Sequence, residues 1–353
     1  MQQARKLHDS IIGSGLPIPC RGKSWSAGKP VRLVVAFTLL IGLMPSPGRS
    51  QAVPATDENI PFLVTFGKDA GTKWGDDDYS QVFFFTVPKG FTEPFYIRVF
   101  DPDCGGQHDE GNGGFNTVTK FSLYGGAGCI TNPDARGVDP TGDYRSGNQL
   151  ASKVFSADAK TDNGWYTFGP INPKDGELEL GYGGQVFKLI CEGIKGDDGN
   201  LYRYFMSTKP DQNVPVEGGN AFTFEYTFRL HADHRQISHI YPFIDSKTIS
   251  VMQHNFDWDN EGYIKLVSVS NAGEYLLTSR ENEWISSKYV VNEKEKMKSL
   301  DIQFKKDPSR VINNNNVVFY LRNQYGESLP FYTIPIGGIP RPSGTMKIEK
   351  AGK

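Results

Sequence analysis

The chain has 353 residues, of which 38 are basic and 40 acidic, so its net charge is only -2. No block of Lys and Arg stands out, and since phosphate binding needs clustered cations, this balance argues against nucleic acid as the main partner. Phe occurs 23 times and Tyr 16 times. Short aromatic and β-branched runs separated by Gly, Asn and Asp clusters are typical of all-β proteins, and this length favours two domains.

Residues 1–52 predict a leader and signal segment that takes no part in the fold. The apolar run at 31–44, "VRLVVAFTLLIGLM", follows three basic residues and precedes the small residues of "PSPGRSQA". This is the pattern of a secretory signal, with cleavage expected after Ser50 or Ala52. The run is shorter than the roughly 20 residues that span a bilayer. We therefore expect a secreted or cell-envelope protein that touches the membrane only if the signal stays uncleaved.

A first β-sandwich domain is expected at 57–232. Its predicted strands are short runs rich in Phe, Tyr, Val and Ile, and turn-forming clusters such as "KGDDGN" separate them. The run at 222–230, "FTFEYTFRL", alternates polar and apolar residues, which predicts one buried and one solvated face. The predicted strands are 61–67, 81–88, 94–100, 119–126, 164–170, 177–182, 185–194, 201–207 and 221–230.

A second β-sandwich domain is expected at 236–340, and the polar tail at 341–353 is expected to fray. Seven or eight short runs follow one another here, with turn signals every 8 to 15 residues. This spacing suits an immunoglobulin-like sandwich. The predicted strands are 237–245, 248–254, 262–270, 274–280, 288–291, 300–306, 316–323 and 331–338.

Acidic side chains crowd the two ends of the segment 74–111. If its runs 81–87 and 94–100 pair as an antiparallel hairpin, both acidic ends lie at one edge. So many like charges need a counter-ion, and oxygen ligands on a Gly-rich loop are those that calcium takes. The alternative is a solvated acidic turn. The predicted calcium ligands are Asp76, Asp77, Asp78, Asp101, Asp103, Gln107, Asp109 and Glu110.

A second, weaker metal candidate is "FDWDNEGY", in which Asp257, Asp259 and Glu261 alternate ahead of Gly262. The spacing matches the opening of a calcium loop, but Ser268 stands where such a loop has its bidentate Glu. A hairpin turn explains this segment better.

Three cysteines follow the predicted signal. Cys104 and Cys129 fall in loops that flank one predicted strand, and they are the expected disulfide pair. Cys191 alternates onto an apolar strand face, which predicts a buried thiol. No spacing among the three matches a zinc module.

No nucleophile, zinc-protease or phosphate-loop motif occurs in the chain, so no catalytic residue is predicted. A carboxylate-based hydrolase stays an alternative, because the separation of a carboxylate pair is invisible in sequence. Aromatic residues in predicted loops are candidate ligand-binding residues, since such rings stack on sugars; the alternative is that they cap the core. The ligand-binding candidates are Trp74, Tyr79 and Trp165.

The pattern "FFFTVP…PFYIRVFDPD" with the later "TKFSLYGG" resembles bacterial secreted β-sandwich modules of the pre-peptidase C-terminal type and their collagen-binding relatives. The resemblance covers residues 60–126. It implies an extracellular module in which acidic loops hold calcium. The matched acidic positions are Asp76, Asp78, Asp101 and Asp103.

Together these features predict two consecutive β-sandwich domains, the first of the jelly-roll or pre-peptidase type and the second immunoglobulin-like. The expected function is non-catalytic binding or adhesion at the cell surface, with calcium stabilising the first domain and an extracellular glycan or protein as partner. The alternative is a structural subunit of a surface assembly.

Overall fold

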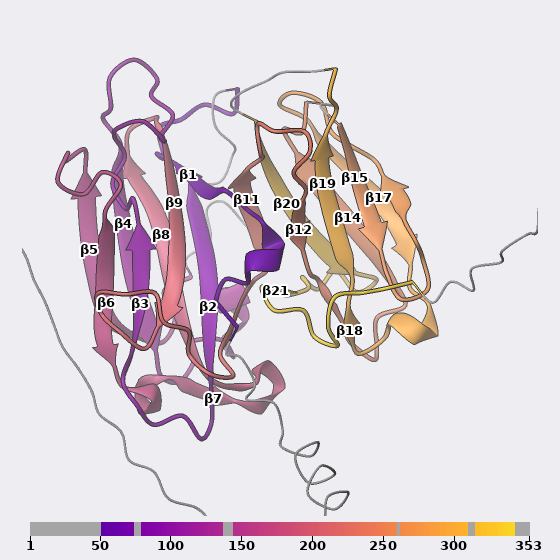
Figure 1. Cartoon of the computed structure of the whole chain (residues 1–353), viewed down its shortest axis with the longest axis horizontal. Coiled ribbons are helices and arrows are strands. Elements are labelled where there is room, and N and C mark those ends of the chain that lie inside the picture. Colours follow the sequence, from indigo (N-terminus) through magenta and orange to yellow (C-terminus); the bar gives the residue numbers. More distant parts are fainter. Residues whose placement is uncertain (1–50, 74–78, 137–143, 260–261, 310–314, 343–353) are drawn as a thin grey trace, which may run out of the picture. The chain divides into compact units, whose positions relative to one another are not determined.

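The computed structural model describes residues 51–73, 79–136, 144–259, 262–309 and 315–342. They form an all-β fold of antiparallel sheets, as the composition predicted (Figure 1). The helical elements are single 3-10 turns, namely η2 (Thr56–Glu58), η3 (Pro133–Arg136), η4 (Pro173–Asp175), η5 (Leu180–Tyr182) and η6 (Glu293–Glu295). Within the described part of the chain, no helix has the length and apolar character needed to cross a membrane.

The largest sheet has eight strands. Their order is β17 (Trp284–Val290), β14 (Ser250–Phe256), β20 (Asn316–Asn323), β11 (Glu225–Arg229), β1 (Phe62–Phe66), β9 (Gly199–Ser207), β3 (Phe95–Phe100) and β6 (Trp165–Ile171).

The second sheet has seven strands. Their order is β21 (Phe331–Tyr332), β10 (Asn220–Thr223), β2 (Ser80–Pro88), β8 (Gly184–Lys195), β4 (Val118–Gly125) and β5 (Asn148–Ser156), with β7 (Glu177–Glu179) paired to β8. A four-stranded sheet has the order β12 (Ser238–Ile240), β19 (Asp301–Lys306), β15 (Gly262–Val267) and β16 (Glu274–Leu276). The last pair is β13 (Phe243–Ile244) with β18 (Lys298–Ser299).

The eight-stranded sheet packs against both other large sheets through aromatic rings. At one end, Phe83 of β2 lies 5.1 Å from Tyr204 of β9, measured between ring centroids. At the other end, Phe304 of β19 lies 5.2 Å from Phe319 of β20. Residues of both ends belong to one buried apolar cluster. One sheet thus forms the shared layer of two sandwich-like halves.

The pairing of β11 with β20 carries the backbone hydrogen bonds of this sheet across the predicted domain boundary, since Tyr226 pairs with Phe319. The division into domains at 57–232 and 236–340 stays a prediction that unfolding can test. Because the sheet and the apolar cluster both cross the boundary, we expect the two segments to unfold in one transition in urea, with coincident tryptophan fluorescence and circular dichroism curves. Two separated transitions would show that the segments fold independently.

The expected hairpin of 81–87 and 94–100 is wrong. β2 pairs with β8 and β10, whereas β3 pairs with β6 and β9 in the other sheet. Both strands are buried along most of their length, and such strands are equally suited to several partners. The loop between them therefore crosses from one sheet to the other instead of closing a hairpin.

The run 221–230 also differs from expectation, because it breaks at Phe224 into β10 and β11, which lie in different sheets. Most of its residues are buried, on both faces. β5, one of the two edge strands of the seven-stranded sheet, is absent from the strands that the sequence predicts. Its side chains are mainly exposed, so it lacks the apolar alternation that marks a half-buried strand.

Candidate metal centre

Two loops meet where β3 ends and β6 begins. β3 and β6 are antiparallel neighbours with Phe100 opposite Trp165, so the segment after β3 lies beside the segment before β6. The Asp101 amide donates to the Gly164 carbonyl over 2.8 Å. In return, the Asn163 amide donates to the Asp101 Oδ1 over 2.9 Å. Asp101 has a positive φ of 55°, which turns the chain sharply out of β3.

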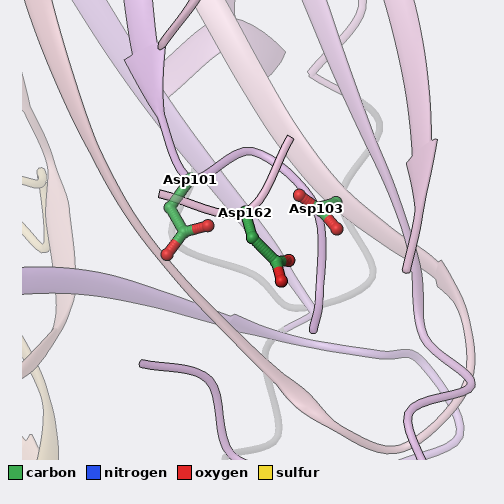
Figure 2. Close-up of side chains that lie close together, drawn as sticks. All are labelled: Asp101, Asp103 and Asp162. Carbon is green, nitrogen blue, oxygen red and sulfur yellow. The ribbon is translucent and has the colours of Figure 1, made fainter. Parts of the chain in front are cut away.

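The meeting of these loops brings together three carboxylates, those of Asp101, Asp103 and Asp162, as Figure 2 shows. One carboxylate oxygen of each residue lies within 4.8 Å of the others. Asp101 and Asp103 are buried, and Asp162 is half-buried. Gly106 makes the approach possible, because a Cβ at that position would lie 2.9 Å from the Asp162 Oδ2. Among the residues that the structure describes, no other group of three potential ligands is assembled in this way.

Asp103 is the most enclosed member of this Asp cluster, with no exposed surface. Its Oδ2 accepts a hydrogen bond of 2.8 Å from the Asp158 amide. Its Oδ1 is buried and has no hydrogen-bond donor among the described residues. The nearby Thr161 hydroxyl donates instead to the Asp158 carbonyl, and its proximity lowers the pKa of Asp103. An unsatisfied buried carboxylate oxygen destabilises a fold, and a cation would satisfy it.

Burial is the main reason why the pKa values of Asp101 and Asp103 are raised. The charge of Asp162 raises both pKa values further, while the nearby His108 lowers that of Asp101. Arg203 also lies close enough to Asp101 for the two charges to interact. Burial and the neighbouring carboxylates thus disfavour the charged forms of Asp101 and Asp103, and a bound divalent cation would favour those charged forms.

Of the remaining predicted ligands, Asp109 and Glu110 have protein partners in the structure. Asp109 accepts hydrogen bonds from the amides of Gly105, over 2.7 Å, and Leu201, over 2.6 Å. One oxygen thus holds the loop to β9 and the other closes a turn within the loop, and burial raises the pKa of Asp109 to about 8. Glu110 forms a buried ion pair with Arg229. Gln107 is exposed. Asp76, Asp77 and Asp78 lie outside the described residues.

Asp162 is the member that sequence reasoning missed. It lies in "SADAKTDNGWY", an acidic loop with an Asn-Gly turn just before a predicted strand. That signal is visible in the sequence, but its meaning depends on β6 being the neighbour of β3. The expected hairpin of 81–87 with 94–100 would place the segment 74–78 beside Asp101, whereas the pairing of β3 with β6 places Asp162 there.

The second metal candidate is only partly described. Asp257 and Asp259 have positive φ angles of 59° and 58°, and the Asn282 amide donates to the Asp257 Oδ1 over 2.9 Å. Burial, with the charges of Asp259 and Glu281, raises the pKa of Asp257 to about 6. Glu261 lies outside the described residues.

The expected disulfide between Cys104 and Cys129 is wrong, because both thiols are free and buried. Cys104 contacts Thr117 just before β4, whereas the Cys129 Sγ lies 3.8 Å from the Tyr124 carbonyl near the end of that strand. The two loops therefore sit at opposite ends of a strand of eight residues. Such a strand is about 25 Å long, far beyond the reach of a disulfide. Cys191 is buried in β8, as predicted.

Of the candidate ligand-binding residues, Trp165 lies beside the Asp cluster and is 37% exposed. Tyr79 is half-buried and Trp74 lies outside the described residues. Comparison of the chain with protein-family models, with curated proteins and with solved structures finds no match. The case for any function therefore rests on the residues themselves.

Proposed function

We propose that this chain is a non-catalytic binding protein of the extracellular space or cell surface, in which the Asp cluster holds a calcium ion. The ion would fix the loops after β3 and before β6 relative to each other. The partner would be an extracellular glycan or protein that contacts these loops.

The observation that carries the proposal is the buried Asp103 Oδ1, which lacks a hydrogen-bond donor among the described residues and belongs to a cluster of three carboxylates. A hard cation is the partner that best satisfies such an oxygen. Calcium fits better than magnesium, because calcium accepts six to eight oxygen ligands in flexible arrangements and the Asp cluster is built from two loops. Magnesium demands near-ideal octahedral geometry.

Export of the protein rests on the apolar run at 31–44 that follows basic residues. The finer architecture that we propose is a jelly-roll sandwich at 57–232 followed by an immunoglobulin-like sandwich at 236–340. The resemblance of residues 60–126 to calcium-binding secreted modules supports the same function.

The proposal predicts calcium-dependent binding by the full chain on a glycan array and in a screen of extracellular matrix proteins, lost on addition of excess chelator. Asp162→Asn should abolish the binding, and it is the variant of choice because Asp162 belongs to the Asp cluster and is the least buried of its three members. Asp134→Asn, at an exposed acidic position on η3, is the control and should bind like the wild type. Binding that ignores the chelator, or no binding at all, would contradict the proposal.

A further inference from the structure

A pocket of about 400 Å³ is lined by the segment that leads into β1 and by residues of β9, β3, β6 and β11 of the eight-stranded sheet. β1 pairs with β9 and β11 only from Phe62 onward. The residues before Phe62 include η2, which lies outside the sheet. Further toward the N-terminus, Val53 contacts β9 again, because its carbonyl accepts a hydrogen bond of 2.9 Å from the Met206 amide. The pocket is lined by this upstream segment, by Tyr204 of β9 and by Tyr226 of β11.

The inner end of the pocket is polar. Glu58 of η2 is 3% exposed, and its Oε1 accepts a hydrogen bond of 2.9 Å from the Tyr226 hydroxyl. Tyr204 lies close enough to hydrogen-bond Tyr226 in turn. Burial raises the pKa of Glu58 to about 8, so this carboxyl is protonated at neutral pH. It can then donate one hydrogen bond as well as accept others.

The outer end of the pocket is an aromatic row across four neighbouring strands. The Arg203 guanidinium lies 4.8 Å from the centroid of Phe62 and 4.5 Å from that of Phe100. The rings of Phe100 and Trp165 follow, with centroids 5.4 Å apart. The guanidinium of Arg98 lies 4.8 Å from the Trp165 centroid, and Arg98 is itself held by hydrogen bonds to Thr167 and Asn213. Trp165 is therefore fixed in place while 37% of its surface stays exposed.

Apolar faces opposite hydrogen-bonding groups are what a sugar ring requires, because a pyranose has an apolar face and a rim of hydroxyls. A volume of about 400 Å³ is in the range of small-molecule sites. We propose that this pocket binds one sugar residue of a glycan, with Trp165 and Phe100 against its apolar face and Glu58 hydrogen-bonded to its hydroxyls. The inference rests on the proposed binding function and adds the ligand class and its location.

The pocket and the Asp cluster share their supporting strands. Asp101 directly follows Phe100 at the end of β3, and Asp162 precedes Trp165 by three residues at the start of β6. A cation that fixes these two loops would therefore also fix the aromatic row. This arrangement makes sugar binding tighter in calcium without placing the sugar on the ion itself.

The test is titration of the full chain with methyl glycosides of glucose, galactose, mannose and N-acetylglucosamine, followed by ligand-observed NMR. At least one should bind, and Trp165→Ala should weaken binding by about tenfold or more, with Trp165→Phe in between. Glu58→Leu should also weaken binding, because Leu can neither donate nor accept a hydrogen bond, whereas Glu58→Gln, whose amide still does both, should bind like the wild type. Trp284→Ala is the matched control, since Trp284 is 40% exposed on β17, away from the pocket.

Binding by none of the four glycosides, or equal binding by wild type and Trp165→Ala, would overturn the inference. The stabilisation by calcium is measured on the same variants. If calcium stabilises the wild type while none of the four glycosides binds it, the pocket inference fails and the cation proposal stands. If calcium does not stabilise the protein but sugar binding still depends on Trp165, the cation proposal fails and the pocket inference stands.

Discussion

Replacing Arg229 by methionine is expected to lower the free energy of unfolding by about 3–5 kcal/mol. Arg229 forms an ion pair with Glu110, and their side chains are only 13% and 4% exposed. Burial lowers the pKa of Arg229 to about 10, so it is still charged at neutral pH. Without the guanidinium, Glu110 becomes a buried charge whose remaining donor is the Asn316 amide nitrogen, at 3.2 Å.

The effect should be large because this ion pair joins three strands and a loop. Arg229 lies opposite Phe62 of β1 and Asn316 of β20, and its Nε donates to the Asn316 Oδ1 over 2.9 Å. Glu110 belongs to the loop that carries Asp101 and Asp103. The ion pair therefore anchors the acidic loop to the centre of the eight-stranded sheet.

Urea unfolding of Arg229→Met, Glu110→Gln and the double variant measures the interaction. We expect the double variant to be less destabilised than the sum of the single variants, because it leaves no unpaired charge. Glu110→Gln should also keep its response to calcium, since Glu110 is committed to Arg229. A loss below about 1 kcal/mol for Arg229→Met, the size of a surface ion pair, would contradict the description of this pair as buried.

Glu58→Gln is expected to become more stable relative to the wild type as pH rises from about 4.5 to about 8. Burial is the main cause that raises the pKa of Glu58 from 4.5 to about 8. Below pH 4.5 the carboxyl is protonated in both the folded and the unfolded state, so folding is not penalised. As pH rises toward 8 the unfolded state gains the charge first, and stability is lost. The total loss is at most about 5 kcal/mol.

The tyrosines around Glu58 do not titrate in this range. Burial raises the pKa values of Tyr204, Tyr226 and Tyr241 above the usual value for tyrosine. Urea unfolding at one-unit steps from pH 4 to pH 9 should therefore show a difference between Glu58→Gln and wild type that grows and then levels off. Glu217→Gln, at an exposed position, is the control. A difference that stays constant with pH would show that Glu58 ionises normally in the folded protein.

The sequence was enough to predict most of the strands but not their partners. Aromatic and β-branched runs marked β2, β3 and β8 because such residues suit a buried pleated surface. Pairing depends on contacts between residues far apart in the chain, and several buried strands are interchangeable in composition. The sequence therefore predicts a hairpin of 81–87 with 94–100, whereas in the structure β3 pairs with β6.

For the candidate site too, local patterns predict some residues, and contacts between distant parts of the chain supply the rest. Asp101 and Asp103 were predicted from their spacing after a strand, and both lie in the Asp cluster. Asp162 comes from about 60 residues further along the chain and joins them only through the pairing of β3 with β6. The sequence pattern predicts Glu110 as a ligand, because its ion pair with Arg229 joins residues too far apart in the chain to be foreseen. Local patterns identified acidic loops, while tertiary contacts decide which carboxylates are available for a cation.

Thermal unfolding of the full chain, first in calcium and then in excess chelator, tests the cation site most directly. Calcium at a hundredfold excess over its dissociation constant should add about 2.7 kcal/mol of stability. The chelator should reverse the gain, and Asp162→Asn should remove it while Asp134→Asn keeps it. An unfolding temperature that calcium leaves unchanged in the wild type would contradict the account, and would leave Asp101, Asp103 and Asp162 as a group of carboxylates that binds no cation.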